Sequence, residues 1–448
     1  MKRLVLTCLK SFILMATITF CVPQAAHAQS VERSWYHLTT GNGHGFQIFD
    51  RNAGRLTDFL EHPYRYVAPP DERRDGGIGR RDLAHDAYFG LGVNGDRRWL
   101  LDLRDVGYES ETHIIRARVR QAGADVEVRY FSPFGFNANA MIMLIRVTNG
   151  TQEALDVELY AKPNLKLGVG RPQPSGDGER IEWNGAQGVE TGPGGGHAMY
   201  VPIGSIDQVG CGRDSSIFDR VRDTGRVGGD ENCQGDDQVL VTGKTLSLGV
   251  GEEVWWGLAV LFVNDDPNEP QANDFKDDRS VADILAAWDE FAGEKSAEAL
   301  YRATMDEFEA WRVTPASLGL DSLTPDEVAL WRQSETVMRM GQVMEPVQAN
   351  RRNRGMFLAA LPIGEWHTGW VRDGAYAIVA QAMTGHVDEA RWGVDFLLGA
   401  WAGFFSSPEY LGRDYRISSV RYYGNGKEEG DFNFFGPNVE TDGFGLTL

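Results

Sequence analysis

The chain has 448 residues, of which 42% are hydrophobic and 11% aromatic, and its formal net charge is −20 at pH 7. This composition is sufficient for two or three domains with packed cores, and it excludes a largely disordered protein. The negative charge disfavours nucleic acid and anionic membrane surfaces as partners, whereas a neutral ligand such as a sugar meets no electrostatic penalty.

Residues 1–28 have the pattern of an export signal. Basic residues come first, an apolar run follows at 12–22, and an Ala-His-Ala cleavage site precedes Gln29. The run is shorter than the roughly 20 apolar residues of a membrane-spanning helix, and the rest of the chain has no uninterrupted run of that length. We therefore expect a soluble mature protein in the periplasm or outside the cell, with no membrane partner.

The apolar residues of the first part of the chain recur at every second position. Ala117 and Val119 alternate with arginines, and Val126 and Val128 alternate with acidic residues, as in half-buried antiparallel strands. Further strands are expected near the end of this part, after a stretch rich in glycine and aspartate that reads as loops. We predict an antiparallel β-super-sandwich at 29–264, with a β plus α multidomain architecture overall.

Details of this first domain follow from its turns and long connections. Asn94-Gly95 and Asn149-Gly150 each predict a tight hairpin, because both central residues of such a turn take positive φ. The loop-like stretch covers 170–237.

The cysteines predict a disulfide. Cys8 and Cys21 leave with the export signal, so Cys211 and Cys233 remain as an even pair in an exported protein. The acidic stretch at 264–278 offers oxygen ligands but lacks EF-hand spacing, so calcium is a minor alternative. The histidines show no i, i+4 pair that would favour zinc. We predict no metal and no cofactor.

The spacing of the apolar residues becomes helical after residue 278. Apolar residues three and four apart occur at 281–292 and at 296–313. We predict a partly helical linker at 265–320, followed by a helical domain at 321–448.

This last domain has a clear first helix. Thr324, Pro325 and Glu327 combine an N-cap, a proline at the first helical position and a capping box. Two more helices, separated by Thr384-Gly385, should form an antiparallel hairpin. The predicted apolar face of the second consists of Val387, Ala390, Val394, Leu397, Leu398 and Trp401.

The sequence Trp-His-Thr-Gly-Trp-Val-Arg-Asp at 366–373 is the strongest functional signal. Sugars bind by stacking on aromatic rings and through charged groups that hold their hydroxyls, and this segment supplies both. The alternatives are core packing for Trp366 and Trp370, and a helix N-cap with a local ion pair for Arg372 and Asp373.

These residues, with Ala359–Pro362 before them and Glu-Thr-Asp-Gly-Phe-Gly at 440–445 after them, resemble glycoside hydrolase family 15, the glucoamylase and glucodextranase family. The resemblance implies a six-hairpin (α/α)6 barrel that follows a β-super-sandwich in bacterial members, so residues 321–448 would be an incomplete (α/α)6 catalytic domain. It also implies an exo-acting enzyme that releases glucose from the non-reducing ends of α-glucan oligosaccharides or polysaccharides with inversion.

By this resemblance, Arg372 and Asp373 hold hydroxyls of the terminal glucose, and Trp370 lines the same pocket. The candidate substrate-binding residues are Trp366, Trp370, Arg372, Asp373, Glu440 and Asp442. The last two also fit the first turn of a helix, where the dipole favours negative charge.

The catalytic groups are a separate question. Inversion requires an acid and a base whose carboxyl groups lie about 6.5–9.5 Å apart. In the family both are glutamates downstream of the position that matches Asp442, so we expect them after Leu448. Glu428, Glu429 and Asp431 occur in a Gly/Asn-rich loop that reads as solvated.

Two other functions remain open at this stage. Glycoside phosphorylases have a similar architecture, and a sandwich with a helical remnant could be a carbohydrate-binding protein without catalysis. The sequence sets neither the linkage preference nor the oligomeric state.

Overall fold

The computed structural model describes residues 36–64, 82–167, 178–192, 196–264, 277–362, 366–430, 432–433, 436–437 and 440. Leu38–Leu448 forms one compact unit, and only Tyr36 and His37 are described of the other, Met1–His37. The predicted export signal, most of the acidic stretch at 264–278, Asp431 and Asp442 lie outside the described residues. Within them, no helix is long and apolar enough to cross a membrane.

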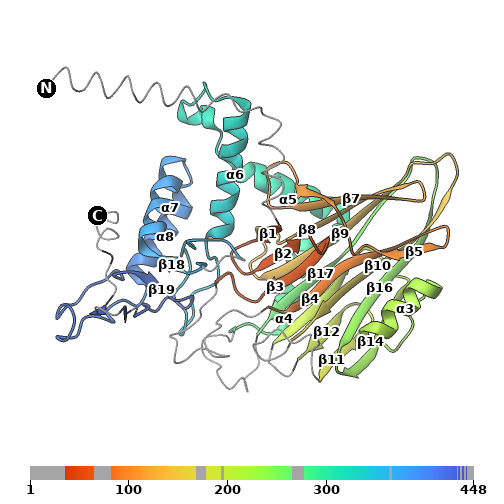
Figure 1. Ribbon diagram of the computed structural model, residues 1–448, viewed down its shortest axis with the longest axis horizontal. Coiled ribbons are helices and arrows are strands. Elements are labelled where there is room, and N and C mark those ends of the chain that lie inside the picture. The colour runs from red at the N-terminus through yellow and green to blue at the C-terminus, as the bar shows by residue number, and fades with distance from the viewer. Residues whose placement is uncertain are drawn as a thin grey trace. The chain divides into compact units, whose positions relative to one another are not determined.

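Two antiparallel sheets make up the first part of the described chain (Figure 1). The eight-stranded sheet has the order β1-β2-β3-β4-β10-β16-β14, with β5 paired to β4. Its strands are β1 (His37–Gly41), β2 (Phe46–Asp50), β3 (Arg55–Leu60), β4 (Ala84–Val93), β5 (Asp96–Trp99), β10 (Leu155–Leu165), β14 (Gln208–Arg213) and β16 (Gln238–Leu248).

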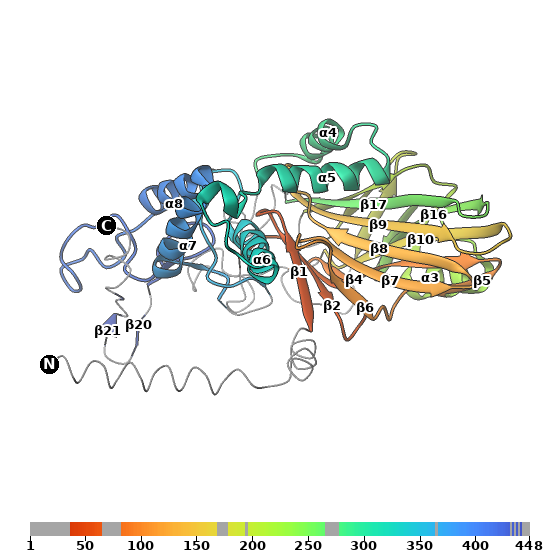
Figure 2. The same ribbon diagram turned by 90° about the horizontal axis from the view of Figure 1, so that it is seen from above.

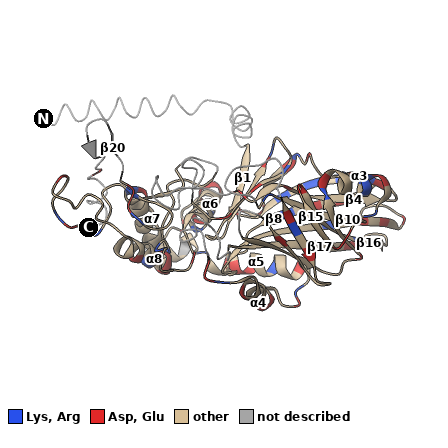
Figure 3. Ribbon diagram, turned by 90° about the horizontal axis from the view of Figure 1, so that it is seen from below, with Lys and Arg blue, Asp and Glu red and all other residues tan. Residues whose placement is uncertain are grey.

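The second sheet has nine strands in the order β15-β11-β12-β13-β17-β9-β8-β7-β6. Its strands are β6 (Asp105–Tyr108), β7 (Ile115–Gln121), β8 (Ala124–Phe131), β9 (Asn139–Asn149), β11 (Glu179–Trp183), β12 (Gly188–Thr191), β13 (His197–Ile203), β15 (Asn232–Gly235) and β17 (Glu253–Val263). Basic and acidic residues lie close together near β8 (Figure 3), where Arg118 and Arg120 of β7 pair with Glu127 and Asp125 of β8. One result is an ion-pair ladder, in which Glu127 contacts Arg118, Arg129 and Arg146.

Helices follow the second sheet and are also inserted within the sandwich. They are α3 (Asp214–Thr224), α4 (Val281–Ala292), α5 (Ala297–Trp311), the 3-10 helix η2 (Pro315–Leu318), α6 (Pro325–Gly341), α7 (Val371–Met383) and α8 (Val387–Gly399). Four two-residue strands complete the described elements: β18 (Gly369–Trp370), β19 (Arg421–Tyr422), β20 (Phe432–Asn433) and β21 (Gly436–Pro437).

The two sheets pack face to face with helices on their outer faces (Figure 2). The inward side chains of both sheets, such as Leu159 and Val260, form one large core. Ile217 of α3 packs on the eight-stranded sheet, and Trp288 of α4 with Leu300 of α5 packs on the nine-stranded sheet. The prediction of a β-sandwich followed by helices is therefore confirmed, whereas the described helices do not establish a closed (α/α)6 barrel.

The local strand predictions were confirmed where side chains alternate. Ala117 pairs with Val128 across β7 and β8, so both face the core. Asn94 and Gly95 have φ values of 51° and 84° and join β4 to β5 in the predicted hairpin.

The second predicted hairpin, at Asn149-Gly150, is wrong. β9 ends at Asn149 in the nine-stranded sheet, whereas β10 begins at Leu155 in the eight-stranded sheet. The Asn149 amide donates to the carbonyl oxygens of Glu153 and Leu248, at 2.7 and 3.0 Å. The Asn149 side chain therefore supplies hydrogen bonds to backbone carbonyl groups where the chain crosses from one sheet to the other. This crossing requires no positive φ at Asn149 or Gly150.

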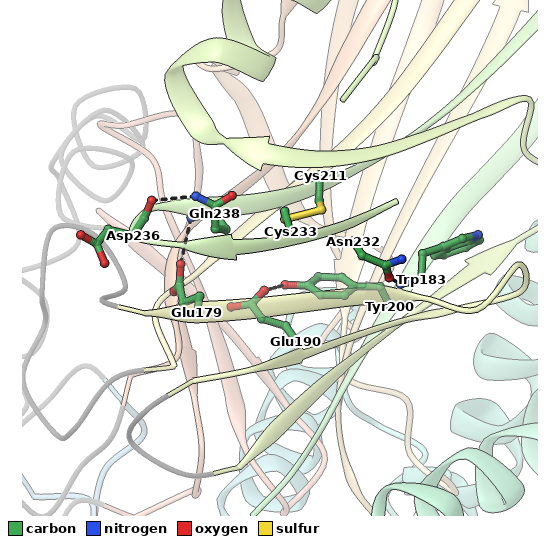
Figure 4. Close-up of a disulfide and its surroundings, with 9 residues drawn as sticks. All are labelled: Glu179, Trp183, Glu190, Tyr200, Cys211, Asn232, Cys233, Asp236 and Gln238. Atoms are coloured by element: carbon green, nitrogen blue, oxygen red, sulfur yellow. Dashed lines mark hydrogen bonds between the residues drawn. A yellow bond between two sulfur atoms is a disulfide. The ribbon is translucent and has the colours of Figure 1, made fainter. Parts of the chain in front are cut away.

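The prediction of loops at 170–237 is also wrong, because β11 to β15 and α3 lie there. These strands are short and interrupted by glycine and polar residues, so they show no clear alternation. Cys211 of β14 and Cys233 of β15 form a disulfide with a Cα–Cα distance of 5.9 Å (Figure 4). Since β14 and β15 are the edge strands of different sheets, the bond joins the two sheets at one edge.

The start signal of α6 is confirmed. The Thr324 side chain accepts a hydrogen bond from the Glu327 N–H, and the Glu327 carboxylate accepts one from the Thr324 N–H. Pro325 is the first helical residue.

The predicted apolar face of α8 is correct only in part. Ala390 and Leu397 are buried as predicted, whereas Val387, Val394 and Leu398 are exposed. α8 has apolar residues on two faces, and the Phe396 side packs inward, with the ring centroids of Phe396 and Tyr422 5.1 Å apart.

Candidate functional site

The Trp-Val-Arg-Asp segment lies where a short strand turns into α7. In the pairing of β18 with β19, Trp370 lies opposite Arg421. Trp370 is the N-cap residue of α7 and makes no side-chain capping bond. Asp373 lies in the first turn of α7. Asp373 is therefore not the N-cap residue, but the local ion pair of that alternative is present, between Arg372 and Asp373.

Two indole rings and a guanidinium group stack beside this turn. The ring centroids of Trp366 and Trp370 are 5.1 Å apart with an interplanar angle of 27°. The Arg421 Cζ atom lies 4.7 Å from the centroid of the Trp370 ring, and Glu429 accepts a hydrogen bond of 3.0 Å from Arg421. Trp366 is 53% exposed, so core packing does not account for it.

Charged groups complete the arrangement. Arg372 Nη1 lies 2.8 Å from Glu440 Oε2, and Arg372 Nε lies 3.8 Å from Asp373 Oδ2. Among the described residues, neither Asp373 Oδ2 nor Trp370 Nε1 has a hydrogen-bond partner, although both atoms are buried. Buried polar atoms are nearly always hydrogen-bonded, so Asp373 Oδ2, next to Arg372, and Trp370 Nε1 each keep unused hydrogen-bonding capacity.

The following loop is organised by a buried carboxylate. Glu428 Oε2 accepts hydrogen bonds from the backbone N–H groups of Gly403 and Phe404, both at 2.8 Å, and from the Tyr415 hydroxyl at 2.6 Å. Glu428 Oε1 accepts one from the Ser419 N–H at 3.0 Å. These bonds satisfy loop backbone groups that would otherwise lack partners.

The prediction that Glu428 and Glu429 are solvated is consequently wrong, since they are only 5% and 7% exposed. Glu429 fixes Arg421, which in turn covers Trp370. The sequence analysis missed Arg421 and Glu429, because their contact depends on a two-residue strand pairing that no sequence spacing marks.

Five of the six predicted substrate-binding residues lie at or near the start of α7. Glu440 contacts Arg372, and its N–H donates to the Ser419 carbonyl oxygen at 3.1 Å. Asp442 lies outside the described residues. In the described part of the chain, no group of three or more His, Cys, Asp or Glu residues could hold a metal ion.

Sizeable cavities lie elsewhere. One of about 400 Å³ lies between the sandwich and the helices, one of about 320 Å³ lies along α8, and another of about 320 Å³ lies between α6 and α7. The described residues that line them do not include Trp370, Arg372 or Asp373. The enclosed sugar pocket expected from the sequence therefore remains a prediction.

No protein-family model matches the sequence, and no curated protein matches it. Among solved structures, a bacterial glucoamylase complexed with acarbose has a TM-score of 0.51 at 12% identity, covering 87% of this chain and 52% of that chain. A putative kojibiose phosphorylase from the human microbiome has a TM-score of 0.46 at 10% identity, covering 87% of this chain and 50% of that one. This chain thus spans about half the length of either protein.

At 12% identity, the likeness to the glucoamylase shows the fold alone. It supports a glucoamylase-like arrangement of sandwich and helices. The weaker likeness to the phosphorylase carries no functional argument.

Proposed function

We propose that this chain is part of an exported glycoside hydrolase of the glucoamylase or glucodextranase type, which releases glucose from the non-reducing ends of α-glucans with inversion. The glucoamylase-like fold and the family 15 resemblance of the Trp-Val-Arg-Asp segment support this proposal. The observation that carries it is that, within the described chain, Asp373 Oδ2 and the Trp370 indole N–H make no hydrogen bond beside the stacked rings.

The groups at the start of α7 match the surface of a terminal glucosyl unit. Asp373 accepts hydrogen bonds from sugar hydroxyls, and Arg372 and the Trp370 indole N–H donate to their oxygens. The exposed ring of Trp366 offers a flat face to the apolar side of the sugar ring. Glu440 holds the Arg372 guanidinium in place. We assign no catalytic acid or base to the described residues.

Asp373→Ala tests the binding role. Hydrogen bonds to a charged group contribute about 1.5–3 kcal/mol each, so maltose affinity measured by calorimetry should fall roughly 10- to 100-fold. Asp388→Ala is the matched control, because Asp388 is an exposed aspartate in the first turn of α8 that, among the described residues, forms an ion pair with Arg391 alone, at 3.5 Å. Equal maltose affinity in the two variants would show that Asp373 does not bind sugar.

The products of turnover test the reaction. With maltose and isomaltose as substrates, β-glucose should appear at a rate independent of inorganic phosphate. Phosphate-dependent release of a sugar phosphate would instead identify a phosphorylase, and binding without turnover would identify a carbohydrate-binding protein. The relative rates on the two disaccharides give the linkage preference.

Export is the remaining part of the proposal. It is supported by the signal pattern at 1–28 and by the disulfide between Cys211 and Cys233. N-terminal sequencing of the mature protein should begin at Gln29. A mature protein that retains Met1 would contradict it.

A further inference from the structure

Two neighbouring cavities share one wall. The larger, of about 400 Å³, lies between the loop after β8 and the helices α5, α6 and α8, and the smaller, of about 320 Å³, runs along α8. Arg354 and Trp392 line both cavities. We call the combined space the α8 groove. Its volume lies within the range of about 300–1,000 Å³ that small-molecule sites occupy.

The larger half of the groove has fixed polar groups between aromatic rings. The Arg339 Cζ atom lies 4.0 Å from the centroid of Phe134 and 4.3 Å from that of Trp311, and Glu307 forms an ion pair with Arg339. The Trp311 indole N–H donates to Glu389 Oε1 at 2.6 Å. For the second oxygen of Glu389, the described part of the chain supplies no hydrogen-bond donor, so this oxygen can act as an acceptor on the groove wall.

The shared wall consists of a guanidinium group on an indole ring. The Arg354 Cζ atom lies 5.4 Å from the centroid of Trp392, and Arg354 Nη1 donates to the Met344 carbonyl oxygen at 3.1 Å. Within the described chain Arg354 forms no ion pair, and its other N–H groups are available as donors.

Gly355 allows the backbone beside Arg354 to approach α8 closely. Gly355 has a φ of 90°, and a Cβ atom there would lie 2.0 Å from the Trp392 carbonyl oxygen. Only glycine fits at such a conformation and separation. The segment that carries Arg354 is therefore pressed against the backbone of α8, which sets Arg354 over Trp392.

The charges that line the groove nearly balance. Glu307 neutralises Arg339. The other charged lining residues are two arginines, Arg352 and Arg354, and two carboxylates, Glu389 and Asp395. Such a wall does not select an anion or a cation. Fixed donors and acceptors between flat aromatic faces match instead a neutral polyhydroxylated ring compound.

We propose that the α8 groove is a second binding site for a neutral oligosaccharide, separate from the candidate site at the start of α7. The groove shares no lining residue with Trp366, Trp370, Arg372 or Asp373. The identity of the sugar as an α-glucan rests on the proposed function. The presence of a neutral saccharide site rests only on the groove.

The test compares maltose with maltoheptaose by calorimetry on the full chain. Trp392→Ala and Arg354→Gln should each weaken maltoheptaose binding about tenfold and leave maltose binding unchanged, because only the longer chain is expected to fill the groove in addition to the first site. Arg391→Ala is the control, since Arg391 is an exposed arginine of α8 that does not line the groove. Arg354→Gln removes little packing, so it remains informative if Trp392→Ala does not fold.

Each outcome decides one statement. Maltoheptaose affinity unchanged in both folded variants would overturn the groove site, and tighter binding of tri-galacturonate than of maltoheptaose would overturn its neutral character. Normal maltose affinity in Asp373→Ala together with weakened maltoheptaose binding in Trp392→Ala would refute the proposed function and support the groove. The reverse pattern would support the proposed function alone.

Discussion

Glu345 is a buried carboxylate that connects the sandwich to the helical part of the chain. Its Oε1 atom lies 2.6 Å from His62 Nδ1, and its Oε2 atom accepts hydrogen bonds from the Tyr64 hydroxyl at 2.6 Å and from the Asn353 amide at 2.7 Å. Arg351 Nη1 lies 3.5 Å from Oε1. Replacing Glu345 by Gln removes the negative charge while keeping the volume of the side chain.

The expected cost follows from the charge left behind. Removing one partner of a buried ion pair typically destabilises a protein by about 3–5 kcal/mol. Arg351 is almost completely buried, and its contact with Asp277 at 3.7 Å compensates its charge in part, so the loss should lie toward the lower end of this range. Burial by itself raises the pKa of Glu345, but the charges of His62 and Arg351, with hydrogen bonds from His62 and Tyr64, outweigh it and lower the pKa from 4.5 to about 2. Because the folded pKa is the lower one, this stabilisation is present above pH 4.5 and is lost as the pH falls toward 2.

Urea unfolding of the wild type and Glu345→Gln, followed from pH 7 down to pH 3, measures both effects. The variant should be less stable at pH 7 by an amount toward the lower end of about 3–5 kcal/mol, and the difference should shrink as the pH falls below 4.5. Glu298→Gln is the control, because the Arg302–Glu298 ion pair is exposed and should contribute less than about 1 kcal/mol. A Glu345→Gln variant as stable as Glu298→Gln would refute the reasoning.

Three smaller predictions concern stability. Cys233→Ser opens a crosslink between residues 22 positions apart and should cost about 3 kcal/mol, so a melting temperature equal to that of the oxidised wild type would contradict it. Thr324→Ala removes the N-cap of α6 and should cost about 1 kcal/mol in urea unfolding; no change would show that the cap is not needed. Burial lowers the pKa of His113 from 6.5 to about 3, so its ring should stay neutral in NMR titrations down to about pH 4, and stability should fall as the pH drops from 6.5; a normal titration midpoint would contradict this.

The sequence predicted correctly those parts of the fold that depend only on residues close together in the chain. Alternation in β7 and β8, the positive-φ turn at Asn94-Gly95 and the capping box at Thr324 are local signals, and each was confirmed. Asn149-Gly150 is the same dipeptide as the hairpin turn Asn94-Gly95, but it does not form a hairpin. Its strands belong to different sheets, and sheet membership depends on contacts far away in the chain.

The candidate site shows the same division. The sequence brought Trp366, Trp370, Arg372 and Asp373 together because they lie within eight residues. Arg421, more than 40 residues away, reaches Trp370 only through the pairing of β18 with β19. Charged residues in a glycine-rich loop look solvated in a sequence, but a loop whose backbone groups are buried needs them as hydrogen-bond acceptors, as Glu428 shows.

The central claim is that the start of α7 holds a sugar through Asp373 and the Trp370 indole N–H. The most direct measurement is the indole region of a proton–nitrogen NMR spectrum during titration with maltose. The chain has 12 tryptophans, and the resonance assigned to Trp370 by its loss in Trp370→Phe should shift as its N–H gains an acceptor. If this resonance stays unchanged at saturating maltose, or no indole signal moves at all, the site does not bind sugar as proposed.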